Sequence, residues 1–201
     1  YGVLAYEKVL PESIIVGLNA NLLNGPLRGD IDSFRRTYFS PPSLTELNSV
    51  SKEEGIQQAG HADKLLAFFQ SDLIPYIDKH YRAQADRTLV GTSLSGLFGL
   101  YVLFHQPNDF QRYIISSPSV YWNNDMIFAI EERFAKAREL VAAKLFISVG
   151  DEELREKITS FAQLLNKERH PKLQSRFHES PLGHVSADIE AIVRGLSFVF
   201  E

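Results

Sequence analysis

The sequence predicts an α/β fold with a mostly parallel central sheet and helices on both of its faces. Short β-branched and aromatic runs alternate along the chain with longer segments of helical periodicity. Strands that alternate with helices form parallel βαβ units joined by right-handed crossovers. The short runs are almost wholly apolar, which is typical of strands buried on both faces.

Before residue 62 the pattern is less regular. Residues 13–18 (SIIVGL) are β-branched and predict a buried strand, and residues 19–51 predict a long loop rich in Gly, Pro, Asn and Ser. A loop of that length is usually functional or mobile. The chain opens at Tyr1 with residues that already fit a helix, so we expect one domain over 1–201 that is incomplete at its N-terminus.

From residue 62 onward, helices and strands follow one another in order. An amphipathic helix is expected at 62–81, with Leu65, Phe69 and Ile77 at helical spacing and a kink at Pro75. The patterns after it predict strands at 87–90, 113–116, 144–149 and 173–179, and helices at 97–105, 124–143, 152–168 and 185–200.

Composition excludes several classes of protein. The chain has 201 residues, a net charge of −4 and no basic block, so a nucleic-acid partner is not expected. It has no cysteine, which excludes disulfides and thiolate chemistry and is compatible with either the cytoplasm or the periplasm. The longest apolar run, 97–104, is about half of the ~18 residues that a membrane span needs, so no membrane span is expected. Composition leaves the oligomeric state open.

The turn after the 87–90 strand reads Gly91-Thr92-Ser93-Leu94-Ser95-Gly96. It is similar to the nucleophile elbow G-x-S-x-G, with Ser95 in place of the second glycine. A sharp strand–turn–helix connection holds such a serine above the sheet, and N–H groups at the helix start stabilise negative charge. The turn predicts Ser93 as a nucleophile and the Leu94 N–H as an oxyanion donor. A serine-rich turn without a catalytic role is the alternative.

Three acidic residues, Asp151, Glu152 and Glu153, follow the 144–149 strand directly. A carboxylate at that place can orient a catalytic histidine and stabilise its imidazolium form. Glu153, three residues after Gly150, is the favoured acid, and Asp151 is the runner-up. Capping of the following helix explains the same residues without catalysis.

His184 lies in the loop between the last strand and the last helix, and it alone of the six histidines has such a position. From that loop a histidine can reach over the sheet to a nucleophile as a general base. His178 and His184 as a metal pair lack a third ligand, so neither a metal nor another cofactor is expected. The order Ser…Asp/Glu…His is that of the α/β-hydrolases, and it differs from the chymotrypsin and subtilisin orders.

These residues make the chain resemble the putative esterase family of α/β-hydrolases, which includes siderophore (enterochelin-type) esterases and S-formylglutathione hydrolases. The likeness covers most of residues 13–195. It is carried by Arg35 to Pro41 (RRTYFSP), Ala62 to Val90, Gly91 to Trp122, and the pair LFISVG and GHVS. The segment SPSVYWNN resembles the siderophore-esterase members in particular.

The resemblance implies hydrolysis of small-molecule carboxylic esters through a seryl-acyl intermediate. Ser93 matches the nucleophile, His184 the base, and Tyr121 and Trp122 an aromatic loop that contacts substrate. A Ser–His pair without an acid is also compatible with it. The family has an upstream strand that supplies a second oxyanion N–H, which we expect to precede Tyr1. A non-catalytic binding module and an acyltransferase are the alternative functions.

Overall fold

The computed structural model of the chain describes residues 10–18, 31–42, 59–137, 142–150 and 152–201. Its centre is a four-stranded sheet in the order β1-β2-β3-β4, in which every neighbouring pair is parallel. The strands are β1 (Thr88–Thr92), β2 (Arg112–Ser116), β3 (Lys144–Val149) and β4 (Gln174–Glu179). The predicted parallel sheet is confirmed, and each strand lies within two residues of its expected bounds.

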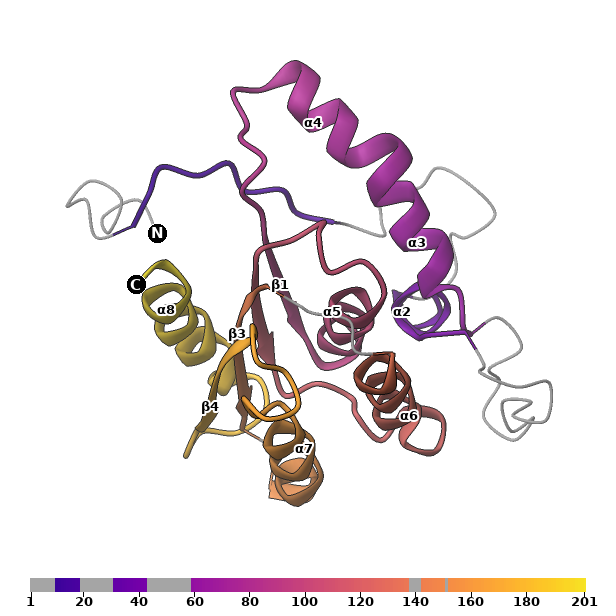
Figure 1. Cartoon of the computed structure of the whole chain (residues 1–201), viewed down its shortest axis with the longest axis vertical. Helices are drawn as coiled ribbons and strands as arrows, with labels where there is room; N and C mark the ends of the chain where they lie inside the picture. The colour runs from indigo at the N-terminus through magenta and orange to yellow at the C-terminus, as the bar shows by residue number, and fades with distance from the viewer. Residues whose placement is uncertain (1–9, 19–30, 43–58, 138–141, 151) are drawn as a thin grey trace.

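Helices cover both faces of this sheet (Figure 1). Helix α8 packs on β2 and β3 from one side, whereas α5 and α7 pack on the other side and α6 packs on α5. The helices are α2 (Ile31–Phe39), α3 (Ala62–Phe68), the π-helical turn η3 (Phe69–Leu73), α4 (Ile74–His80), α5 (Ser93–His105), α6 (Trp122–Lys136), α7 (Glu152–Leu164) and α8 (Ser186–Phe200).

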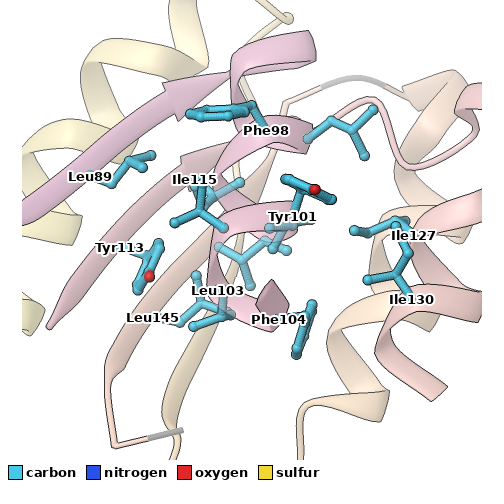
Figure 2. Packing of buried hydrophobic residues seen from close by; sticks show 14 of the residues in the cluster. Leu89, Phe98, Tyr101, Leu103, Phe104, Tyr113, Ile115, Ile127, Ile130 and Leu145 are labelled. Carbon is cyan, nitrogen blue, oxygen red and sulfur yellow. The ribbon is translucent and has the colours of Figure 1, made fainter. Parts of the chain in front are cut away.

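The alternation of side chains along the strands divides the core in two. Tyr113 and Ile115 of β2 point toward α5 and join the large cluster drawn in Figure 2. Ile114, between them, points the other way and packs with Phe146, Ala191, Phe198 and Val199. A strand with both faces buried therefore needs the continuous apolar run that the sequence has here.

The predicted helix at 62–81 is present but is not a regular α-helix throughout. Residues Phe69–Leu73 form a π-helical turn directly before Pro75, which is the second residue of α4. Proline has no N–H and its ring displaces the carbonyl four residues earlier, so the backbone widens locally. The expected kink thus takes the form of a π turn.

Two expectations for the N-terminal part are wrong. Residues 13–18 form no strand, because they pair with no strand among the described residues, and they are exposed, with Ile15 at 75%. Within the predicted loop at 19–51, residues Ile31–Phe39 form α2, which packs on α3 and α5. The rest of that predicted loop lies outside the described residues, apart from 40–42.

Candidate active site

The carboxyl ends of four parallel strands meet at one edge of the sheet, which is where ligands bind in open α/β folds. The register aligns Thr92 of β1 with Ser116 of β2, and Ser116 with Ser148 of β3. The segments that leave this edge are the start of α5, the loop 117–121, Gly150 and the loop 180–185. The predicted nucleophile and base lie on two of these segments.

Ser93 occupies a strained backbone conformation. Its φ is +54°, whereas Thr92 before it is extended with φ −128° and ψ 148°. A non-glycine residue in the left-handed region costs about 1–2 kcal/mol and persists only when its surroundings enforce it. Gly91 contributes to that turn, because a Cβ built on it would lie 2.6 Å from the Ser95 carbonyl carbon.

Ser95, which replaces the second glycine of the motif, has a structural role in the turn. Its Oγ accepts a hydrogen bond from the Thr92 N–H at 3.0 Å and donates one to the Thr92 carbonyl at 2.7 Å. The Thr92 side chain in turn accepts a bond from the Ser95 N–H, which completes a capping box at the start of α5. The serine therefore secures the turn that carries Ser93.

The loop after β2 contacts Ser93 from the side. Ser119 is buried, its Oγ lies 3.3 Å from Ser93 Oγ, and its N–H donates to the Ser93 carbonyl at 3.1 Å. Ser117 has a left-handed φ of +41°, and its Oγ accepts a bond from the Gly150 N–H at 3.1 Å. Serines of this one loop thus connect the end of β3 to the predicted nucleophile.

The loop that carries His184 lies directly over the end of β3. A Cβ built on Gly150 would collide with the Ala187 side chain and would lie 2.9 Å from the Leu182 carbonyl oxygen. The loop closes on itself through a 2.9 Å bond from the Ala187 N–H to the Gly183 carbonyl. His184 is half-buried in the turn before α8.

Two carboxylates of α8 fasten this loop to its surroundings. Thr92 Oγ1 donates to Asp188 Oδ1 at 2.8 Å, which joins β1 to the first turn of α8. Ser180 Oγ donates to Glu190 Oε2 at 2.5 Å, and Arg194 Nε donates to the other oxygen at 2.7 Å. These bonds, first from Ser180 and then from Arg194, lower the pKa of Glu190 to about 2.

The other predicted residues have different outcomes. Leu94 is half-buried in the first turn of α5, and Glu153 is the second residue of α7. Asp151 lies outside the described residues, so the choice of acid stays a prediction. Tyr121 is 45% exposed, whereas Trp122 packs partly against the core.

Sequence reasoning missed Thr92, Ser119 and Asp188. Thr92 occupies a variable position of the elbow motif, and Asp188 looks like an ordinary first-turn acid of a helix. Ser119 lies in the segment SPSVYW, but only the three-dimensional structure shows that its hydroxyl contacts that of Ser93. The hydrogen bond between Thr92 and Asp188 joins residues 96 positions apart, so no local sequence pattern predicts it.

The described residues contain neither a metal-binding cluster nor a membrane-spanning helix. Their His, Asp and Glu side chains form no group of three or more suited to hold a metal ion. Their helices include none with the length and apolar character to cross a membrane.

Comparisons with known proteins show the family of this chain. The family model described as "Putative esterase" matches residues 42–188. Ferri-bacillibactin esterase BesA of Bacillus subtilis (strain 168) is 34% identical over 100 residues, which are 49% of this chain and 35% of BesA. A siderophore enterobactin esterase of Emericella nidulans is 29% identical over 156 residues, which are 72% of this chain and 52% of that protein. The chain thus spans about a third to a half of these curated relatives.

Solved structures give the same fold. The crystal structure of the BES protein from Bacillus cereus matches with a TM-score of 0.80 and 27% identity over 100% of this chain and 74% of that one. An IroE-like serine hydrolase from Shewanella oneidensis matches with a TM-score of 0.72 and 20% identity over 83% of this chain and 56% of that one. The predicted α/β-hydrolase fold is therefore confirmed.

Proposed function

This chain belongs to the putative esterase family, and from that premise we propose that it is a serine hydrolase that cleaves carboxylic esters through an acyl intermediate on Ser93. The relatives BesA of Bacillus subtilis and the Emericella nidulans enzyme are named as siderophore esterases. We propose a siderophore ester as the substrate of this chain as well.

The observation that carries the proposal is the backbone of Ser93. Its φ of +54° lies between an extended strand residue and a buried helix, as the nucleophile elbow requires. Three sets of contacts hold Ser93 in this conformation. The backbone of Gly91 lies close to that of Ser95, the Ser95 and Thr92 side chains form the capping box, and Ser119 contacts the Ser93 hydroxyl. Strained residues cluster at functional sites, and this one stands between a strand and a buried helix, which favours a nucleophile elbow over a serine-rich turn without a catalytic role.

In the acylation step, Ser93 Oγ attacks the ester carbonyl carbon and its proton passes to His184. The carbon becomes tetrahedral, and the N–H of Leu94 at the start of α5 stabilises the resulting oxyanion. The bond to the alcohol oxygen then breaks, and His184 returns the proton to the departing alcohol. The products of this step are a seryl ester on Ser93 and a free alcohol.

In the deacylation step, His184 takes a proton from water, and the resulting hydroxide attacks the seryl ester carbonyl. The bond to Ser93 Oγ breaks, Ser93 recovers its proton from His184, and the carboxylic acid leaves. Glu153, with Asp151 as the runner-up, orients the imidazole and stabilises its charged form through both steps. Tyr121 and Trp122 are proposed to contact the substrate beside the elbow.

A fluorophosphonate probe tests the nucleophile. We expect a covalent adduct on the peptide that contains Ser93, together with hydrolysis of p-nitrophenyl esters, ferri-bacillibactin and enterobactin. Ser93→Ala should lower kcat by at least about 10⁴-fold without changing the unfolding curve. If the protein reacts with the probe, and unlabelled enzyme hydrolyses none of these esters but transfers their acyl group through Ser93 to an added alcohol, it would be an acyltransferase. An unlabelled and inactive protein would be a binding module.

Two variants measured side by side identify the acid. Glu153→Gln and Asp151→Asn remove one negative charge each and keep the size of the side chain. The variant that lowers kcat by several orders of magnitude names the triad acid, as removal of such a charge does in serine proteases. Equal, wild-type rates for both would indicate a Ser–His pair.

A further inference from the structure

A second serine hydroxyl lies against the proposed nucleophile. Ser119 is 2% exposed, and its Oγ is 3.3 Å from Ser93 Oγ. The same residue donates its N–H to the Ser93 carbonyl oxygen at 3.1 Å. Ser119 is therefore bonded to both the backbone and the side chain of Ser93.

The position of Ser119 is fixed by the loop that carries it. Ser117, two residues earlier, donates its N–H to the Ser148 carbonyl at 2.8 Å and accepts the Gly150 N–H on its Oγ at 3.1 Å. Val120 closes a tight turn through a 2.7 Å bond from its N–H to the Pro118 carbonyl. Because the loop is attached to the end of β3 on one side and to Ser93 on the other, the backbone of Ser119 is held beside Ser93.

The direction of the Ser93–Ser119 hydrogen bond follows from the proposed mechanism. Either hydroxyl can donate when the protein is at rest. In the reactive arrangement, however, Ser93 gives its proton to His184, so Ser93 Oγ can only accept. Ser119 must then be the donor, and it keeps its own proton throughout the reaction.

We propose that Ser119 is a positioning residue, whose hydroxyl donates to Ser93 Oγ, holds it in the attacking orientation and stabilises the negative charge that develops as the Ser93 proton leaves. A hydrogen bond strengthens as its acceptor becomes charged, and burial of the donor strengthens it further. The contribution is therefore larger in the transition state than in the resting enzyme, which is the condition for a rate effect. This inference rests on the proposed function of Ser93.

Phosphonylation by a fluorophosphonate probe isolates this effect, because it is a single displacement at Ser93 Oγ with no later turnover. We compare Ser119→Ala, which removes the hydroxyl, with Ser119→Cys, which keeps a similar volume but donates only weakly. The chain has no other cysteine, so thiol titration of the Cys variant reports directly whether the new side chain stays buried. The matched control is Ser148→Ala, since Ser148 is also fully buried and its Oγ donates to another serine, Ser116, at 3.4 Å.

The expected result is a fall in the maximal rate of phosphonylation of roughly tenfold in both Ser119 variants, with the concentration of probe at half-saturation unchanged. Ser148→Ala should label within about twofold of the wild-type rate, even if urea unfolding shows that it loses as much stability as Ser119→Ala.

Three results with the variants would overturn the role of Ser119 alone. If Ser119→Ala is phosphonylated at the wild-type rate, Ser119 has no role in the reaction. If Ser119→Cys is phosphonylated at the wild-type rate, only the packing of the side chain matters. An equal loss in Ser148→Ala would show a general effect of buried serines. A wild-type protein that takes no probe would overturn the proposed function and the role of Ser119 together, so the two failures are distinguishable.

Discussion

Thr92 Oγ1 donates a hydrogen bond of 2.8 Å to Asp188 Oδ1. Thr92 precedes the proposed nucleophile by one residue, and Asp188 follows the proposed base by one helical turn. The same hydroxyl accepts the Ser95 N–H in the capping box of α5. One side chain thus links the start of α5, which carries the proposed nucleophile, to the first turn of α8, which follows the proposed base.

A double-mutant cycle measures this tie. Thr92→Val and Asp188→Ala each remove one partner, and we expect a coupling free energy of unfolding of about 2 kcal/mol because the acceptor is charged. Both single variants should also lower kcat/KM, since the base loop then loses its attachment. Thr92→Ser keeps the hydroxyl and serves as the control. If the losses of unfolding free energy in the two single variants add up to the loss in the double variant, the two side chains are not coupled.

Gly150→Ala should displace the His184 loop. The new methyl group collides with Ala187 and approaches the Leu182 carbonyl, and misplacement of a catalytic group by about 1 Å costs on the order of 10²-fold in rate. Adding Ala187→Gly to this variant should restore part of kcat, because it removes the principal clash.

Gly183→Ala provides the control for that experiment. It adds the same methyl group next to His184, where no atom beyond the two neighbouring residues of the chain lies within 4 Å of the new one. Its kcat should stay within a few-fold of the wild-type value. If both alanine variants lose activity equally, the close approach at Gly150 is not what positions the loop.

Ser95→Ala should lower the free energy of unfolding by about 1 kcal/mol, which is the usual cost of losing a helix cap. The variant breaks both side-chain bonds to the Thr92 backbone. Ser95→Gly, which restores the glycine of the motif, loses the same bonds and should be no more stable. Urea unfolding measures both variants, and a stability above wild type for either would show that the serine crowds the turn.

The buried Glu131 gives a pH-dependent prediction. Burial alone would raise its pKa, but hydrogen bonds from His170 at 2.7 Å and from Arg169 at 2.5 and 2.8 Å outweigh that effect and lower it. A lowered pKa means that the unfolded chain binds the proton more readily, so this stabilisation is present above the unfolded pKa of about 4.3 and is lost as the pH falls through the folded value.

Glu131→Gln should therefore cost about 2 kcal/mol of unfolding free energy at pH 7, because it breaks the ion pair with Arg169. The wild-type and variant stabilities should converge as the pH falls below the unfolded pKa of about 4.3 and through the lowered folded pKa of Glu131. Urea titrations at pH 7, 5 and 3.5 measure the difference. A difference that stays constant with pH would mean that the carboxylate charge is not its source.

Strands β2 and β3 could be predicted from the sequence because each is buried on both faces and therefore has a continuous apolar run. Strand β4 has no such run, since its residues are exposed or half-buried, and it was predicted from its place in the alternation of strands and helices. Because Ser93 and His184 directly follow predicted strands in the sequence, their location at the carboxyl edge of the sheet could also be predicted. The segment 13–18 has the same composition as a strand but forms none, because a strand needs a partner to pair with. Helix α2 was missed because its residues lie within a segment rich in Gly, Pro and Asn.

The finer parts of the site depend on contacts between distant residues. Ser93 and Ser119 come together because β1 and β2 are neighbours in register, and no residue pattern around Ser119 specifies which serine it faces. Ser95 stands where the elbow motif has its second glycine, and only the structure shows that its hydroxyl completes a cap. Chemistry at such positions follows from tertiary geometry, which composition and periodicity do not encode.

The spatial order of the strands follows their order along the chain. During synthesis, each new strand and helix can dock onto the unit made just before it, without waiting for a distant segment. Ser93 is then held in its turn early, while the loop with His184 and the helix with Asp188 emerge about 90 residues later. On the proposed mechanism, Ser93 of a nascent chain would therefore stay unreactive until α8 packs on the sheet and places His184. Reaction of Ser93 with a probe would then indicate that the sheet and α8 have assembled.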